Sequence, residues 1–500
     1  MRLHRRSAAA AAIVLSTTLA ASPALAAPNP NSPDKLAKAV TVENTMKHLQ
    51  AFQAIADDND GNRAAGTSGY EASAQYVEKT LAAAGYTTER QYFDFFFEQV
   101  LNTSLTVGGE TIENTPMSYS PAAPDGGVTG PLATPKVATG CAPTDWAGFP
   151  AGSIAVVSRG ICSFNQKSME ASKAGASAVI IYNNAEGALN GTLGEVADGQ
   201  IPTTGVTQAV GAELVAAAGT EATFVLDKVI EMRQTFNILA ETKTGRADNV
   251  VMLGAHLDGA PEGPGINDNG SGSAAILETA VQLGKVNKVN NKVRFAWWGA
   301  EELGLIGSTH YVNDLVENDP AELANIAGYL NFDMVASPNY IIGVYDANES
   351  SYPAPVAVPE GSVALEKVFT DYFDSTKQPW VDTEFSGRSD YAAFIENGIA
   401  STGLFTGADD IKTAEEVALF GGREGILMDP NYHTAGDDLS NVNTTALGIN
   451  VKAIAYATGT LAYDTSMVNG KTSPGKSGKE KKAKKAKKVK PNVTINRAAA

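Results

Sequence analysis

Six side chains that can bind metal ions or move protons stand in the second half of the chain. They follow short apolar runs or lie between them, and they are His256, Asp268, Glu301, Glu302, Asp333 and His433. Imidazole and carboxylate ligands without a thiolate are typical of zinc, although residue types alone leave manganese and cobalt open. A hydrolytic zinc site needs three protein ligands and an open position, and one carboxylate can bridge two ions about 3.5–4 Å apart. With five candidate ligands, two metal ions are the better prediction.

The adjacent pair Glu301 and Glu302 can divide two tasks of such a site. One carboxylate can bind metal while its neighbour acts as general base toward the attacking water, which typically contributes about 10²–10⁴ in rate. Each of the six residues also has an ordinary explanation, as a strand-end histidine, a turn former or a charge at a helix N-terminus. Their joint occurrence favours a site, because uncompensated carboxylates crowded into one crevice would repel strongly.

Apolar runs typical of β-strands must position these side chains. VVMLGA leads to His256, VRFAWWGA leads to the glutamate pair, and GYLNF leads to Asp333. The runs alternate with helical stretches such as SAAILETAVQLGKV, which predicts an α/β sheet with covered faces. Ligand crevices of open α/β sheets lie beyond the carboxyl ends of the strands, so these side chains should converge. Asp268 joins them if the loop GAPEGPGIND returns to the same crevice.

Composition divides the chain into successive segments. Residues 1–26 have a basic start, an apolar run and a small-residue end, the layout of a cleaved signal peptide. Its apolar run is too short and too rich in alanine for a stable membrane span, and no later stretch is long and apolar enough for a membrane helix. The lysine-rich end should be disordered, and serves either to tether the protein to an anionic surface polymer or only as a solvated tail. The predicted segments after the signal are a leader at 27–40, a larger domain at 41–110 and 233–465, a small Gly-, Pro- and Ala-rich unit at 111–232, and the tail at 466–500.

Charge and cysteine content limit the partners and the compartment. The net charge is −17, and the basic signal and tail mask a still more acidic body. Such a body repels nucleic acid and anionic lipid and favours metal ions or protonated amines. Cys141 and Cys162 are the two cysteines. In an exported chain they are expected to form a disulfide worth about 3 kcal/mol, with two buried thiols as the alternative.

The longer motifs around these residues resemble the secreted bacterial di-zinc aminopeptidases of the aminopeptidase S and aminopeptidase Y type, the leucine aminopeptidase type. These motifs are GAHLDGAPEGPGINDNGSGSAAILETA, RFAWWGAEELGLIGS, LNFDM, TEFSGRSDYAAF, GLFTGA and YHTAGDDLSN, within residues 41–465. The resemblance implies a zinc-exopeptidase fold, an α/β architecture with a mixed, mostly parallel sheet flanked by helices. Residues 111–232 resemble an inserted, small α+β protease-associated (PA) domain, whose role the sequence leaves open.

The resemblance also implies a role for each site residue. His256 and Asp333 would bind one zinc, Glu302 and His433 the other, and Asp268 would bridge them, followed by a cis peptide to Asn269. Glu301 would be the general base. The remaining implied roles are Asp258 orienting the ligand, Tyr432 donating to the developing oxyanion, Arg388 near the substrate carbonyl, and Phe405 as a wall of the side-chain pocket. Tyr432 could instead be a packing aromatic, and Arg388 a partner of Asp390.

An acidic, metal-lined crevice suits a free α-amine, so the predicted reaction is release of N-terminal residues from peptides and proteins. The resemblance implies that the released residues are large and hydrophobic, leucine-like ones. The prediction includes two Zn²⁺ per chain, calcium as a candidate modulator, a monomer, and a secreted protein associated with the cell surface through its tail. One alternative is a carboxypeptidase or another peptide hydrolase on the same site. A carboxypeptidase needs additional basic anchors for the substrate carboxylate, and the sequence offers only Arg388 as an obvious one, which argues against it. A non-catalytic peptide-binding protein is the other, and the complete ligand set with Glu301 argues against it.

Overall fold

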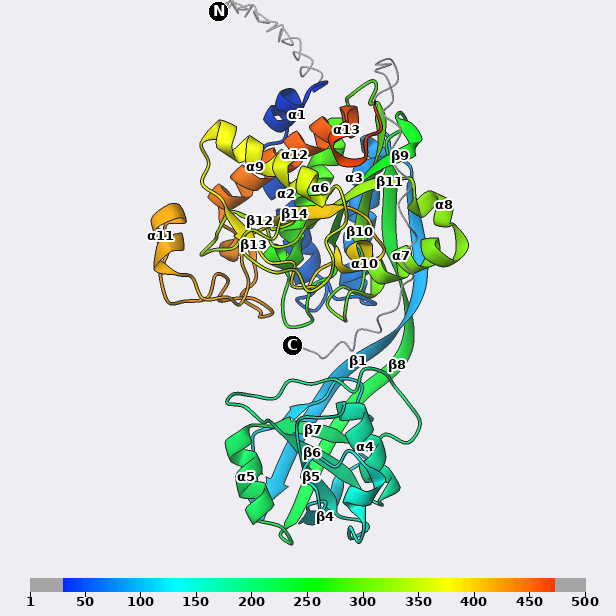
Figure 1. The fold of residues 1–500 in the computed structure, drawn as a ribbon, viewed down its shortest axis with the longest axis vertical. Helices are drawn as coiled ribbons and strands as arrows, with labels where there is room; N and C mark the ends of the chain where they lie inside the picture. The colour runs from blue at the N-terminus through cyan, green and yellow to red at the C-terminus, as the bar shows by residue number, and fades with distance from the viewer. Residues whose placement is uncertain (1–29, 473–500) are drawn as a thin grey trace, which may run out of the picture.

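The computed structural model describes residues 30–472, so the predicted signal segment and residues 473–500 of the predicted tail lie outside the described residues. Within that range, no helix combines the length and hydropathy that crossing a bilayer requires. The described chain forms two bodies joined by a long antiparallel ribbon of strands β1 (Thr88–Val107) and β8 (Glu221–Glu241) (Figure 1). The two strands pair from Thr88↔Ala240 to Val107↔Ala222, with an irregularity between Val100 and Asn102.

The larger body is built on a mixed, mostly parallel sheet, as predicted. Its strand order is β13-β12-β14-β11-β9-β10-β8, and its pairs are parallel except β12 with β14 and β10 with β8. Strands β9, β10 and β11 match the three apolar runs expected from the sequence, and β14 contains the start of the motif GLFTGA. The strand bounds are β9 (Arg246–His256), β10 (Asn291–Trp298), β11 (Ile326–Phe332), β12 (Gly343–Tyr345), β13 (Val381–Thr383) and β14 (Ser401–Phe405).

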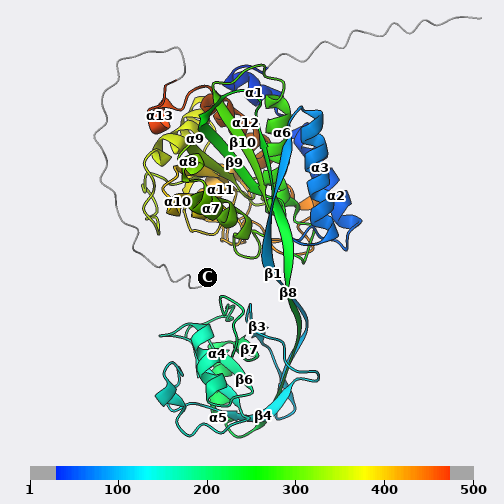
Figure 2. The same ribbon diagram turned by 90° about the vertical axis from the view of Figure 1, so that its right-hand side faces the viewer.

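Helices cover both faces of this sheet, because alternate residues of the central strands point to opposite sides. On β10, Phe295 and Trp297 join one hydrophobic core while Ala296 and Trp298 join the other. Figure 2 shows α2 and α3 on one side of the sheet and α7 and α10 on the other. The first core is covered by α1 (Pro33–Ala39), α2 (Val42–Asp57), α3 (Ser68–Ala83), α6 (Gly272–Leu283), α9 (Ser362–Thr376) and α12 (Thr444–Tyr463). The second is covered by α7 (Ile306–Asn318), α8 (Pro320–Leu323) and α10 (Ala392–Glu396).

The smaller body is an α+β unit that continues the ribbon. Parallel strands β4, β5, β6 and β7 follow β8 in sheet order, and β5 and β6 are buried on both faces. Residues of these two strands contribute alternately to two separate hydrophobic clusters. Its elements are β2 (Glu110–Ile112), β3 (Thr115–Pro116), β4 (Val128–Ala133), η1 (Pro143–Trp146), β5 (Ile154–Ser158), α4 (Phe164–Lys173), β6 (Ala178–Tyr182), β7 (Thr203–Val206) and α5 (Gln208–Ala216).

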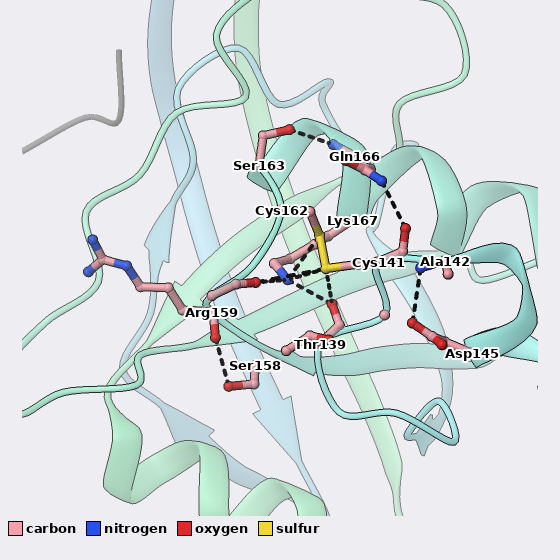
Figure 3. The surroundings of a disulfide bond; sticks show 12 residues. Thr139, Cys141, Ala142, Asp145, Ser158, Arg159, Cys162, Ser163, Gln166 and Lys167 are labelled. Atoms are coloured by element: carbon pink, nitrogen blue, oxygen red, sulfur yellow. Dashed lines mark hydrogen bonds between the residues drawn. A yellow bond between two sulfur atoms is a disulfide. The ribbon is translucent and has the colours of Figure 1, made fainter. Parts of the chain in front are cut away.

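Cys141 and Cys162 form the predicted disulfide in the smaller body (Figure 3). The Lys167 ammonium lies beside it, 3.4 Å from the Cys162 Sγ atom, and donates to the main-chain oxygens of Thr139 and Gly160. Burial lowers the pKa of Lys167 to about 8, with Asp145 opposing the shift. The disulfide and the lysine together tie two loops at one end of the small sheet.

The observed boundaries differ from the sequence expectation at three places. Helix α1, with Leu36 buried, lies in the predicted leader and packs on α12, so the larger body begins before residue 41. Ser466–Asn469 form helix α13 with Val468 buried, so the expectation of a disordered segment from residue 466 is wrong for these residues. The ribbon strands β1 and β8 continue through both bodies, and the composition of the chain did not indicate this continuity.

Candidate metal centre

The six predicted residues come together at one edge of the larger sheet. His256 is the last residue of β9, Asp333 follows β11 directly, and Glu301 and Glu302 follow β10 by three and four residues. These three strands are adjacent and parallel, so their carboxyl ends meet. Asp268 enters from the segment η2 (Ile266–Ser271), and His433 from the loop between α11 (Ala414–Phe420) and η3 (Leu439–Asn441).

Asp268 lies at the middle of the cluster and faces two groups of side chains. Its Oδ1 atom is 3.2 Å from His256 Nε2, and that same nitrogen is 3.2 Å from Asp333 Oδ1. Its Oδ2 atom is 3.2 Å from His433 Nε2, which in turn is 2.9 Å from Glu302 Oε2. One carboxylate therefore stands between two imidazole–carboxylate pairs.

The donor set fits metal ions. Potential ligand atoms of His256, Glu301 and Asp333, and of His256, Asp268 and Glu302, lie within 4.8 Å of one another. The Glu302 Oε1 atom is buried and has no hydrogen-bond partner among the described residues. A buried carboxylate oxygen without a donor is costly, and a cation would satisfy it. Nitrogen and oxygen ligands without sulfur are those of zinc in hydrolytic centres.

Crowding of acids and imidazoles perturbs the proton affinities of the site. Burial raises the pKa of Glu302 to about 7, and the nearby Asp268 adds to that shift. Burial alone would lower the pKa of His256, but the carboxylates of Glu301 and Asp333 raise it well above its ordinary value. The pKa of Asp268 shifts in the opposite direction. Burial alone would raise it, but hydrogen bonds with His256 and His433 lower it below its ordinary value. The cluster as a whole attracts positive charge.

Asp258 has a different contact from the one implied by the resemblance. The Nδ1 atom of His256 is 3.0 Å from the main-chain oxygen of Asp258, whereas the nearer carboxylate oxygen is 3.8 Å away. The carboxylate instead accepts the main-chain N–H groups of Glu301 at 3.2 Å and of Glu302 at 3.3 Å. Asp258 thus orients the glutamate pair through its carboxylate and the histidine through its carbonyl.

Two supporting residues escaped the sequence analysis. Asp437 is buried and accepts the main-chain N–H groups of Asn267 at 2.8 Å and Asp268 at 2.9 Å. Ser389 donates to Asp333 Oδ2 at 2.6 Å. Asp437 lies within the motif YHTAGDDLSN and Ser389 within TEFSGRSDYAAF. Nothing in these motifs distinguishes a residue that holds a metal ligand from an ordinary loop residue.

The loop geometry around the ligands is also unusual. The peptide bond between Asp268 and Asn269 is cis, as the resemblance implied. Asn269 ties this segment to β11, because its side chain donates to Phe332 O and accepts from Gly272 N. His433 adopts a positive φ of 54°, and its ring stacks on that of Tyr432 with centroids 3.8 Å apart.

A cavity of about 290 Å³ opens over the cluster. Tyr432, Arg388 and Phe405 all lie in its wall, as do the apolar side chains Met334 and Tyr345. Arg388 pairs with Asp409, at 3.1 Å and 3.4 Å, whereas the alternative weighed from the sequence was a pair with Asp390. The structure therefore brings most of the predicted site residues of the larger body to the wall of one cavity. His433 and the buried Asp258 lie outside this wall, but both contact residues that line it.

Comparisons with known proteins agree with this geometry. The family model described as Peptidase family M28 matches residues 237–458, and the PA domain model matches residues 128–214. The Probable lipoprotein aminopeptidase LpqL of Mycobacterium tuberculosis is 46% identical over 439 residues, which cover 86% of this chain and 87% of the relative. Leucine aminopeptidase 2 of Trichophyton rubrum is 41% identical over 428 residues, 85% of each chain. Among solved structures, BSAP, a zinc aminopeptidase from Bacillus subtilis, superimposes with a TM-score of 0.60 at 27% identity, covering 83% of this chain and 94% of that one.

Proposed function

This chain belongs to peptidase family M28 and is a zinc aminopeptidase, and we propose that it works with two zinc ions bridged by Asp268. One observation carries the proposal. The two carboxylate oxygens of Asp268 face separate ligand pairs, His256 with Asp333 on one side and His433 with Glu302 on the other. A carboxylate so placed can bind one ion through each oxygen. When bound, zinc would polarise the scissile carbonyl and lower the pKa of water to about 7.

Glu301 would move the proton in this reaction. Its side chain lies in the cavity wall on the His256 side, with Oε2 3.8 Å from His256 Nε2. Burial raises its pKa well above the ordinary value, with His256 opposing and Asp390 and Asp333 adding to the shift. A carboxyl group of raised pKa can accept a proton from the attacking water and hold it for the leaving amine. Asp258 would keep this carboxylate in place through the main-chain contact described above.

Two further side chains would act on the substrate carbonyl. Tyr432 stands in the cavity wall beside His433, and its phenol would donate a hydrogen bond to the oxygen that gains charge. Arg388 lies on the same wall, where its pair with Asp409 leaves its side chain 51% exposed. A donor aimed at developing charge stabilises the transition state more than the substrate, so it raises turnover.

The walls of the cavity suit a large apolar N-terminal residue with a free amine. Met334, Tyr345 and Phe405 supply apolar surface, while Asp333 and Glu301 can receive an ammonium group. A leucine side chain gains about 1.5–3 kcal/mol when fully buried. The name of the Trichophyton relative, a leucine aminopeptidase, supports the same preference.

Zinc content measured together with hydrolysis of leucine anilide and N-acetyl-leucine anilide tests the proposal. We expect two zinc ions per chain and cleavage of only the free-amine compound. The Glu301→Gln protein should retain both ions and lose about 10²–10⁴ in turnover, whereas Glu302→Gln should lose zinc. One zinc per chain, or full turnover in Glu301→Gln, would contradict the assignment.

Two alternative functions are less well supported. A carboxypeptidase needs additional basic anchors for the substrate carboxylate, and Arg388 is the single arginine or lysine among the residues that line the cavity. Equal cleavage of the acetylated anilide would favour that class or an endopeptidase. A non-catalytic binding protein would not need Glu301 beside a complete ligand set, and absence of hydrolysis in zinc-loaded protein would favour it.

We also propose that the enzyme is exported and acts as a monomer at the cell surface. The signal-like segment 1–26 and the disulfide support export, since disulfides persist in oxidising compartments. The lysine-rich end would bind an anionic surface polymer. The tether would be established if added salt releases the full-length enzyme from cells, whereas enzyme without residues 473–500 is found in the medium without added salt. Calcium as a modulator is open to direct test by titration of activity.

A further inference from the structure

Arg63 is a fully buried cation in the loop between α2 and α3, nearly two hundred residues before the metal centre in sequence. Its guanidinium donates from Nη1 to Leu257 O at 2.6 Å, from Nε to Pro264 O at 2.8 Å, and from Nη2 to Gly265 O. The guanidinium also lies 5.1 Å from the centroid of the Phe52 ring. All three of these hydrogen bonds reach the main chain of one loop.

That loop lies between two of the five proposed metal ligands, His256 and Asp268. Leu257 stands between His256 and Asp258, and Gly265 precedes the segment that contains Asp268. The three carbonyls that Arg63 binds therefore fix the start and the end of the loop relative to each other. Arginine is suited to this task, because its planar fork reaches several acceptors in a fixed geometry.

Glycines make room for the guanidinium beneath the loop. Gly265 has a φ of +61°, and a Cβ added there would lie 3.2 Å from Arg63 Nη2 and 2.5 Å from Asp268 O. A Cβ at Gly270 would lie 3.6 Å from the same nitrogen, and one at Gly259 3.7 Å. The glycine-rich composition of this stretch is therefore matched to a buried arginine as well as to a tight chain path.

The charge of Arg63 also suits its surroundings. Burying a cation costs several kcal/mol unless other groups compensate it. Burial lowers the pKa of Arg63 to about 10, so the side chain stays charged at neutral pH, and Asp437, Asp258, Asp268 and Glu302 lie near enough to favour that charge. A permanent cation below the acidic cluster would limit the repulsion among these carboxylates.

We propose that Arg63 is a positioning residue of the metal centre, holding the loop from Leu257 to Gly265 so that Asp268 presents one oxygen to each ligand pair. This inference rests on the proposed two-zinc function. Arg63 lies beneath the loop and donates to main-chain carbonyls, so it acts on the reaction through the ligands.

Zinc affinity of the full-length enzyme tests the proposal, measured by competition with a chelator in Arg63→Lys and Arg63→Met. Removal of groups that orient metal ligands typically costs 10–100-fold in metal affinity. We expect about this loss for Arg63→Met. A smaller loss is expected for Arg63→Lys, which keeps the charge without the fork. The kcat measured at saturating zinc should fall as well, because displacement of Asp268 would shift the bridging carboxylate relative to the other metal ligands.

A matched control is Arg90→Met, since Arg90 also binds within the larger body, through Glu71 and Glu78, yet contacts no residue of this loop. It should lower the melting temperature of the zinc-free protein without changing zinc affinity. If the Arg63 variants bind both zinc ions with wild-type affinity and differ from wild type only in a lower melting temperature of the zinc-free protein, Arg63 is merely structural and the proposal is wrong. If wild-type enzyme binds fewer than two zinc ions, the two-zinc function fails instead. Should Arg63→Met be insoluble, Arg63→Lys alone decides the question.

Discussion

Substitution of Asp437 by Asn gives a sharp test of how the bridging ligand is held. The Asp437 carboxylate accepts two main-chain N–H groups, those of Asn267 and Asp268, and a third hydrogen bond from the Asn441 amide at 3.0 Å. An Asn side chain keeps one oxygen, and its NH₂ group would face a main-chain donor. One buried N–H would then have no acceptor.

The magnitude follows from these contacts. An unsatisfied buried donor costs about 1–3 kcal/mol, and the remaining bonds lose the strength that a charged acceptor gives. We expect the free energy of unfolding to fall by about 2–4 kcal/mol, which corresponds to roughly 4–16 °C in melting temperature at about 2–4 °C per kcal/mol. Displacement of Asp268 should weaken zinc binding about 10–100-fold.

Both quantities should be measured at pH 8, because burial raises the pKa of Asp437 to about 7 and the carboxylate must be ionised. Asp438→Asn is the matched control, since that neighbouring side chain accepts from Ser440 N at the start of η3 and Asn serves equally well at such a position. Asp437→Asn with a melting temperature and zinc affinity like those of the control would refute the reasoning.

Three further predictions concern the pocket and the smaller body. Phe405→Ala should reduce the preference for leucine over alanine anilide about tenfold in kcat/KM, because one methylene group in an apolar pocket is worth about 10–200-fold. An unchanged ratio would show that Phe405 does not line the pocket for the N-terminal side chain. The double substitution of Cys141 and Cys162 by Ser should lower the stability of the PA domain by about 3 kcal/mol, measured by denaturant unfolding, with zinc content unaffected. The pKa of Lys167 is lowered to about 8 in the folded protein, whereas its ordinary value is 10.5. Between pH 8 and pH 10.5 the unfolded chain therefore binds more protons at this residue than the folded protein does. The stability of wild type relative to Lys167→Met should therefore rise from pH 7.5 to pH 9.5, and a fall over that interval would contradict the burial of its charge.

Much of the fold was predictable because its elements are written in local patterns. Continuous apolar runs leading to His256, Glu301 and Asp333 predicted three strands whose ends converge, and the helical stretch SAAILETAVQLGKV predicted helix α6. The long ribbon was missed, since β1 mixes exposed and buried aromatic residues such as Tyr92 and Phe93 and runs from one domain into the other. No local pattern records that a strand continues into a second body.

The sequence by itself determined the donor set of the metal centre, because imidazoles and carboxylates placed at strand ends have few other uses in such numbers. Only the tertiary structure decided which groups hold those donors. Arg63 reaches Leu257 and Gly265 across nearly two hundred residues, and Asp437 binds the N–H of Asp268 from the opposite end of the chain. The physical reason is that a side chain's chemistry is local, whereas the partner of a buried polar group depends on which distant segments pack together.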